Sequence, residues 1–195
     1  LRPNYFTIAG VVITSLGAAA FMMGYMRPAG IFILFGGFCD TIDGSLARTT
    51  GKASRLGALF DSVVDRYSEF IMYLGIGAYF INIEDYSTAA GTFLALCGSF
   101  MVSYARARAE SLGFEAKLGF MQRPERIVLI GLGAIIQIAS FKIAIWLVAI
   151  LAIALAINVV HSRVGRAFRA IHGSELAAET MGIDTARFKV SALVI

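Results

Sequence analysis

The chain has 195 residues, of which 58% are hydrophobic and 15% charged, and its formal net charge is +4. Soluble domains carry about a quarter charged residues, so the composition argues against a soluble domain and indicates a membrane protein. Nucleic acid does not explain the positive charge, because the basic residues stand beside apolar segments, where lipid phosphates account for them. The two cysteines have no CxxC spacing and predict neither a zinc site nor a disulfide framework.

Six apolar segments approach the length of about 20 residues that a helix needs to cross the hydrocarbon core. In chain order they span residues 6–25, 29–47, 57–80, 88–109, 124–140 and 143–160. Pro28 and Pro124 stand near the start of the second and fifth segments, where a missing N–H does no harm. The break between the last two segments depends only on Ser140, Phe141 and Lys142, which we interpret as a tight hairpin. The sequence therefore predicts an all-α, polytopic membrane protein with six transmembrane helices.

Basic residues alternate between the two ends of these segments. The connections after the second and fourth segments, and the stretch after the sixth, are rich in Lys and Arg, whereas the opposite side carries only Arg27 and Lys142. The positive-inside rule then predicts a multi-pass protein of the cell membrane with both termini cytoplasmic. We expect residues 1–170 to form the transmembrane domain and residues 171–195 to form a cytoplasmic tail.

Four carboxylates stand at the predicted cytoplasmic ends of the second and third segments. Asp40 and Asp43 are three residues apart and Asp61 and Asp65 are four apart, so each pair shares one face of its helix. Four converging carboxylates would repel one another unless cations stood between them. Oxygen ligands suit a hard cation, which predicts a site for Mg²⁺ or Mn²⁺. Structural ion pairs with nearby arginines are the alternative, and the helical spacing of all four favours the metal site.

The residues around these aspartates resemble the signature of the CDP-alcohol phosphotransferase family, also called class I CDP-alcohol phosphatidyltransferases. The match runs through Asp40-Thr-Ile-Asp43-Gly44-Ser-Leu-Ala47-Arg48 and continues at Gly57, Asp61 and Asp65. It holds at all eight defining positions. The opening Pro3-Asn4-Tyr5-Phe6-Thr7 also resembles the start of the family's first membrane helix.

This resemblance implies a six-helix membrane fold, commonly a homodimer, with an active site open to the cytoplasm. It implies transfer from a CDP-linked lipid, either CDP-diacylglycerol or an archaeal ether equivalent, with release of CMP. Carried over, the metal ligands are Asp40, Asp43 and Asp61, while Asp65 both approaches the metal and acts as the general base. The residues that would contact or make room for the nucleotide are Asn4, Thr7, Gly44, Ala47, Arg48 and Gly57.

The acceptor alcohol must be inferred from other residues. The stretch 103–110 ends the fourth segment and the stretch 122–126 opens the fifth, and both are rich in arginine. The guanidinium group of arginine can donate two parallel hydrogen bonds to the oxygens of a phosphate. We therefore expect a phosphate-bearing acceptor to be bound by Ser103, Arg106, Arg126, Arg163 and Arg166. Both stretches also resemble phosphatidylinositol-phosphate and archaetidylinositol-phosphate synthases, which implies inositol 1-phosphate as the acceptor. Glycerol 3-phosphate, inositol and serine remain alternatives, as does contact of these arginines with membrane lipids.

A divalent-cation channel or transporter is the alternative from another functional class. Such a protein would distribute polar groups through the membrane depth. Here the last two apolar segments are almost free of charge and the aspartates stay at one surface, which favours the enzyme.

Overall fold

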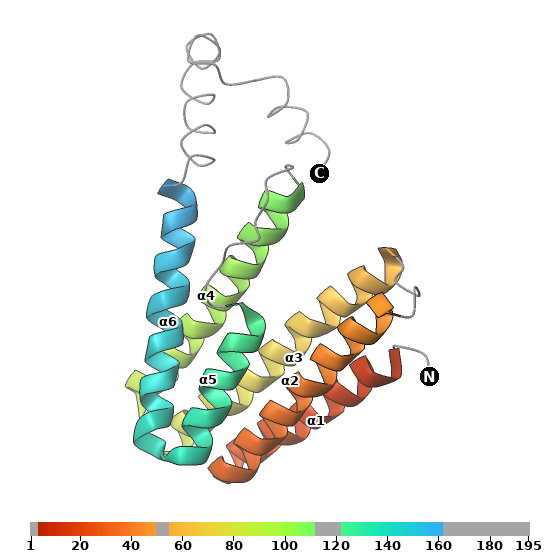
Figure 1. Ribbon diagram of the computed structural model, residues 1–195. Helices are drawn as coiled ribbons and strands as arrows, with labels where there is room; N and C mark the ends of the chain where they lie inside the picture. The colour runs from red at the N-terminus through yellow and green to blue at the C-terminus, as the bar shows by residue number, and fades with distance from the viewer. Residues whose placement is uncertain (1–3, 50–54, 112–121, 162–195) are drawn as a thin grey trace, which may run out of the picture.

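The structure is a computed structural model that describes residues 4–49, 55–111 and 122–161 (Figure 1). Within these ranges the chain forms six α-helices and no strand. The helices are α1 (Asn4–Met22), α2 (Met26–Thr49), α3 (Arg55–Asn82), α4 (Tyr86–Ser111), α5 (Arg123–Ile136) and α6 (Ile138–His161). The predicted all-α class is confirmed, and each predicted apolar segment corresponds to one helix, with bounds that differ by a few residues.

The position predicted for the last hairpin is wrong. The chain breaks at Gln137, which has extended backbone angles (φ −167°, ψ 157°), and Ser140 and Phe141 already belong to α6. A side chain at Gly133 would place its Cβ 2.9 Å from the Cβ of Ala144. The turn is tight because Gly133 lets the two helices approach closely, a tertiary contact that has no local sequence signal.

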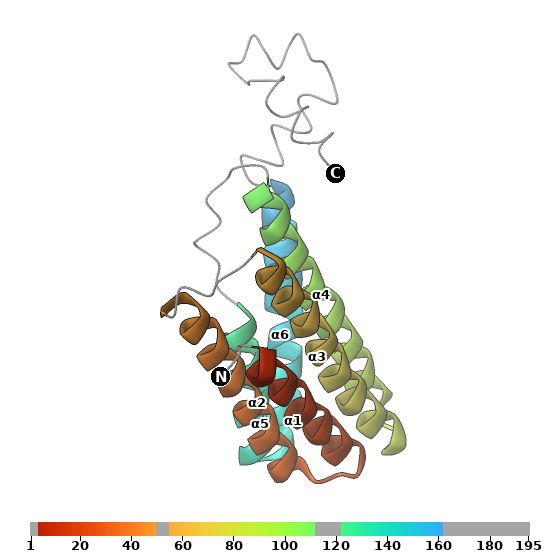
Figure 2. The same cartoon turned by 90° about the vertical axis from the view of Figure 1, so that its right-hand side faces the viewer.

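The closely packed helix pairs form a closed ring in the order α1, α2, α5, α6, α4, α3 and back to α1. The three short turns, which join α1 to α2, α3 to α4 and α5 to α6, lie at the same end of the bundle (Figure 1 and Figure 2). It follows that the end of α2 and the beginnings of α3 and α5 share the opposite end, where the aspartates stand.

Aromatic side chains and close helix approaches hold the ring together. The Phe141 ring of α6 stacks on Phe21 of α1 and on Phe80 of α3, with centroids 5.1 Å and 5.8 Å away. At Gly75 a Cβ would lie 2.5 Å from the carbonyl oxygen of Ala18, so only glycine allows α3 to pack this closely on α1. These contacts fix how far each helix is shifted along the bundle axis, and therefore which side chains of neighbouring helices meet.

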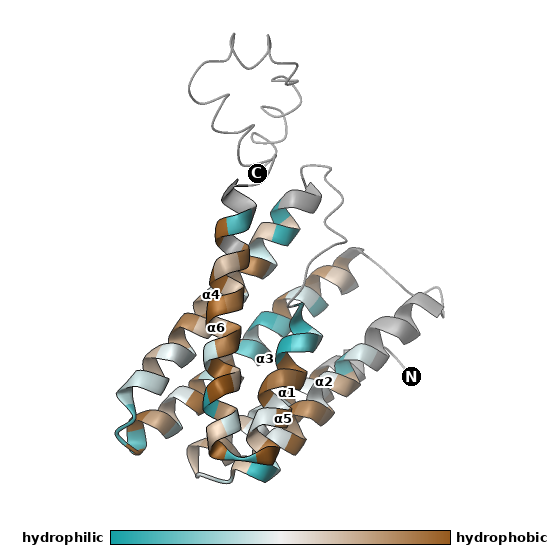
Figure 3. Ribbon diagram, turned by 60° about the vertical axis from the view of Figure 1, so that its left-hand side comes forward, coloured by the Kyte–Doolittle hydropathy of each residue, from teal (hydrophilic) through white to brown (hydrophobic). Residues whose placement is uncertain are grey.

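Large apolar side chains are exposed on all six helices in the described part of the chain, and the hydropathy-coloured ribbon shows apolar residues in brown along the helices (Figure 3). Exposed side chains such as Val12, Phe35, Phe93 and Ile150 form the kind of surface that faces lipid. In the described part of the chain, two helices are long and apolar enough to cross a membrane, over Tyr86–Arg108 and Ile138–Leu155. In the same part, Ile8–Met22 of α1 forms a shorter apolar helix. The six-span topology stays a prediction.

Candidate metal and transfer site

Three of the four predicted carboxylates come together at the end of the bundle away from the short turns. Oxygen atoms of Asp40 from α2 and of Asp61 and Asp65 from α3 all lie within 4.8 Å of one another. Asp61 and Asp65 share a face of α3 because they are one turn apart. Asp40 meets them although α2 and α3 are not among the closely packed helix pairs. The cluster therefore depends on α1, which packs against both α2 and α3.

The donor set of this cluster fits a hard divalent cation. All three groups offer carboxylate oxygens, the ligand type that hard divalent cations take, and these oxygens lie close together. Oδ1 of Asp65 is buried and has no well-aligned hydrogen-bond donor, although a guanidinium nitrogen lies 2.6 Å away as an ion-pair partner. An oxygen whose single partner is this ion pair still has a lone pair with which it can bind a metal ion.

A residue that the sequence reasoning did not select stands between the carboxylates. Nη1 of Arg123, at the start of α5, pairs with Oδ2 of Asp40 and with Oδ1 of Asp65. The Arg123 side chain is 15% exposed, as is that of Asp65. A signal was present in the sequence, because Arg123 lies three residues before Arg126 and therefore on the same helix face.

Arg126 forms a second link one turn deeper in the bundle. Its Nε and Nη2 donate to Oε1 and Oε2 of Glu69 at 2.9 Å and 3.1 Å. Both side chains are only 1% exposed. Glu69 stands four residues after Asp65 on α3, and Arg126 stands three residues after Arg123 on α5. The two helices are therefore joined by two successive ion pairs, Asp65–Arg123 and Glu69–Arg126. In this geometry Arg126, predicted as an acceptor ligand, joins α5 to α3.

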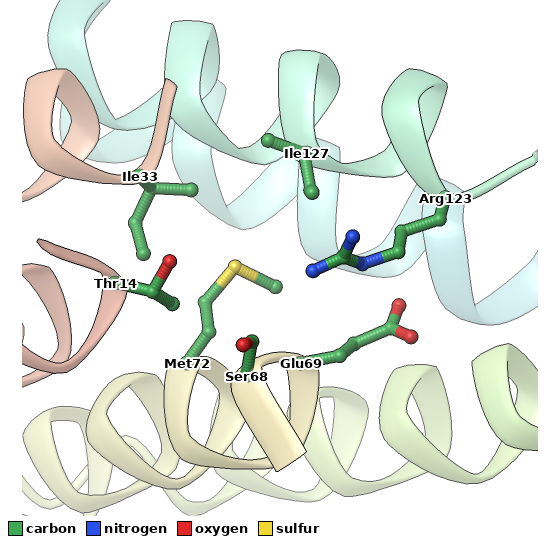
Figure 4. Close-up of a pocket in the computed structure, with 7 residues that line it drawn as sticks. All are labelled: Thr14, Ile33, Ser68, Glu69, Met72, Arg123 and Ile127. Atoms are coloured by element: carbon green, nitrogen blue, oxygen red, sulfur yellow. The ribbon is translucent and has the colours of Figure 1, made fainter. Parts of the chain in front are cut away.

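The first turn of α5, where Arg123 and Arg126 begin the helix, has its own N-terminal cap. Pro124 occupies the first turn, and the Gln122 N–H donates to Oε2 of Glu125 at 3.1 Å as half of a capping box. Below Arg123, a small cavity with room for about one water molecule opens between α1, α2, α3 and α5 (Figure 4). Nε of Arg123, which lines this cavity, is buried without a hydrogen-bond partner.

The remaining predicted site residues are only partly described. Ser103 is half-buried and Arg106 is exposed, both near the end of α4. Gly57 lies in the first turn of α3. Several residues lie in α1 or α2, but their side chains fall outside the described part; they are Asn4, Thr7, Asp43, Gly44, Ala47 and Arg48. Arg163 and Arg166 lie outside the described residues altogether. The metal, nucleotide and acceptor roles stay predictions.

Comparison with known proteins identifies relatives that share both sequence and fold. The archaetidylinositol phosphate synthase of Pyrococcus horikoshii is 40% identical over 152 residues, which cover 77% of this chain and 77% of the relative. The crystal structure of the Mycobacterium tuberculosis phosphatidylinositol phosphate synthase with CDP-DAG bound superimposes with a TM-score of 0.74 at 29% identity. That similarity covers 83% of this chain and 85% of the other.

A second crystal structure of the mycobacterial enzyme is in complex with manganese and citrate. It matches this chain with a TM-score of 0.73 at 29% identity, over 83% of this chain and 81% of that one. The family model described as CDP-alcohol phosphatidyltransferase matches residues 1–163, a stretch that contains the whole aspartate signature. On the strength of that match, the fold and the carboxylate cluster, this chain belongs to the CDP-alcohol phosphatidyltransferase family.

Proposed function

We propose that this chain transfers a phosphatidyl-type group from a CDP-linked lipid to an inositol phosphate and releases CMP. The observation that carries the proposal is the convergence of Asp40, Asp61 and Asp65 within the family signature. The acceptor is supported by the relatives, whose names describe archaetidylinositol phosphate and phosphatidylinositol phosphate synthases. The donor class is supported by the CDP-DAG bound to the mycobacterial enzyme.

In this proposal Asp40, Asp43, Asp61 and Asp65 hold Mg²⁺ or Mn²⁺, and the manganese complex of the mycobacterial enzyme supports this metal class. When bound, such a cation neutralises the diphosphate and polarises its phosphorus–oxygen bonds. The nucleotide half of the donor is assigned to the residues around this cluster, namely Asn4, Thr7, Gly44, Ala47, Arg48 and Gly57.

The transfer is a single displacement at the phosphorus that carries the lipid. Asp65 takes the proton of the acceptor hydroxyl, and the acceptor oxygen forms a bond to that phosphorus. The bond from the same phosphorus to the bridging oxygen of the diphosphate breaks, and its electron pair leaves with CMP. Asp65 is chosen as the base from the family resemblance, in which the aspartate at its position can both approach the metal and deprotonate the acceptor.

The acceptor phosphate is assigned to Ser103 and Arg106, together with Arg163 and Arg166. Arg126 stays a predicted ligand of this phosphate, although its two bonds to Glu69 favour a role in holding α5 against α3. The proposal also includes six membrane crossings with both termini in the cytoplasm, because the short turns all lie at one end. A homodimer is proposed from the family resemblance alone.

The test is CMP release by the purified protein with inositol phosphate, inositol, glycerol 3-phosphate or serine as the acceptor. We expect turnover with inositol phosphate only. Arg106→Ala should raise the KM for inositol phosphate by about ten- to hundredfold, the effect of losing a hydrogen bond to a charged group. Arg108→Ala is the matched control, because residues two apart diverge on a helix. CMP release that depends on another acceptor would overturn the assignment of inositol phosphate.

A further inference from the structure

The position of Arg123 has a consequence for metal binding. Its Nη1 contacts Asp40 and Asp65, two of the three carboxylates that converge at the proposed metal site. A cation that bridges these carboxylates must approach their oxygens to about 2.1 Å, as Mg²⁺ does in proteins. The guanidinium already contacts one oxygen of each carboxylate, so an ion that binds those same oxygens has to displace it.

Burial makes the competition effective. The side chains of Arg123 and Asp65 are 15% exposed and that of Asp40 is 24% exposed. Ion pairs at the open surface are weak because water and salt screen them. This one is largely shielded, so it retains more of its strength. A divalent ion that enters the cluster competes with the guanidinium for the charge of both carboxylates, and it is repelled by the guanidinium as long as the two are close.

The backbone that carries Arg123 is held independently of the metal site. The capping box of Gln122 and Glu125 fixes the first turn of α5. One turn further, the buried pair of Arg126 and Glu69 anchors α5 to α3. Movement of the guanidinium therefore requires rotation of the Arg123 side chain alone, while the helix stays in place.

The surroundings of the guanidinium are compatible with such movement. Its Nε lies at the wall of the small cavity without a hydrogen-bond partner, so one of its donors has nothing to lose on rotation (Figure 4). The ion pairs with Asp40 and Asp65 are thus the main interactions that the structure shows for the guanidinium group of Arg123.

We propose that Arg123 is the resident counter-ion of the carboxylate cluster and exchanges with the divalent cation. The inference rests on the proposed metal-dependent function. In the metal-free protein Arg123 offsets the repulsion among Asp40, Asp61 and Asp65. When a cation binds, the guanidinium leaves these oxygens. Arg123 thereby lowers the affinity of the site for metal and makes the cluster stable without it.

The experiment measures Mn²⁺ binding to the purified protein in detergent, without substrate, from the electron paramagnetic resonance signal of free Mn²⁺. Arg123→Gln should bind Mn²⁺ about tenfold more tightly than wild type, because a competing charged hydrogen bond is lost. Arg123→Lys should lie between them, since it keeps the positive charge but its compact ammonium is more strongly hydrated than a guanidinium and holds the two carboxylates less firmly. Arg27→Gln is the matched control, because it removes the same charge from an exposed residue at the other end of α2.

The outcomes separate the two proposals. Unchanged or weaker Mn²⁺ binding in the Arg123→Gln protein overturns the exchange, provided that the protein still shows a cooperative melting transition. If that variant does not fold, an Mn²⁺ affinity of Arg123→Lys equal to wild type overturns it instead. If wild type does not bind Mn²⁺, or if Asp61→Asn binds it as well as wild type does, the proposed metal-dependent function fails.

Discussion

The buried pair of Glu69 and Arg126 can be removed from either side, and the two possible roles of Arg126 then predict different results. Both side chains are 1% exposed and meet through two hydrogen bonds of 2.9 Å and 3.1 Å. Arg126→Ala leaves the Glu69 carboxylate inside the bundle without its partner. Removal of one member of a buried ion pair typically costs about 3–5 kcal/mol.

Changing both members has a different expected effect. A protein with Glu69→Leu and Arg126→Met together has no buried charge at this position, and such replacements are often neutral or even stabilising by about 1–4 kcal/mol. We therefore expect the single variants Arg126→Met and Glu69→Leu, like Arg126→Ala, to lower the free energy of unfolding strongly. The double variant should recover most of it. This non-additivity is the signature of a direct pair.

Two measurements are needed on each variant. Denaturant unfolding of the purified protein in detergent gives stability, and titration of inositol phosphate at saturating CDP-linked lipid gives the acceptor KM. If Arg126 binds the acceptor phosphate, Arg126→Ala should raise this KM about ten- to hundredfold and the double variant should keep that defect. Unchanged stability of Arg126→Ala combined with such a rise would refute our reading of Arg126 as a helix link.

Three further predictions concern single aspartates. Asp61→Asn should abolish CMP release and Mn²⁺ binding together, because it removes one of three converging ligands; retained CMP release in a folded variant would remove Asp61 from the site. Asp65→Asn should lower turnover by about 10²–10⁴-fold while nucleotide binding, followed by titration with CMP, stays near wild type; a loss of CMP binding with normal turnover would contradict the role as base. At the opposite end of the bundle, hydrogen bonds from Lys142 and then from Thr88 hold the pKa of the Asp85 carboxyl well below its usual range. Because the folded-state pKa is lowered, the stabilisation is present above the unfolded value of 3.8 and is lost as the pH falls through and below that value. The melting temperature of Asp85→Asn should thus lie below that of wild type at pH 7 and approach it in acid, and a difference that does not change with pH would contradict this.

The sequence alone determined the helical class and the composition of the candidate site. Six apolar segments each became a helix, because a segment of that length and polarity can satisfy its backbone only as a helix where water is scarce. The spacing of Asp61 and Asp65 placed both on one face of α3, since the period of a helix is a local property. Family membership was likewise visible in the fixed spacing of the aspartates and glycines.

Only the tertiary structure decided what the two arginines of α5 meet. Arg123 and Arg126 share a helix face, so the sequence could not tell which of them would reach the carboxylate cluster and which would lie a turn deeper against Glu69. That choice depends on the depth at which α5 packs in the ring, which is set by close approaches such as that of Gly131 to Gly30. The last hairpin followed the same rule, because the break at Gln137 arises where Gly133 admits α6. Local spacing specifies a helix face, whereas the partner of that face and its depth are fixed by contacts between helices that are distant in the sequence.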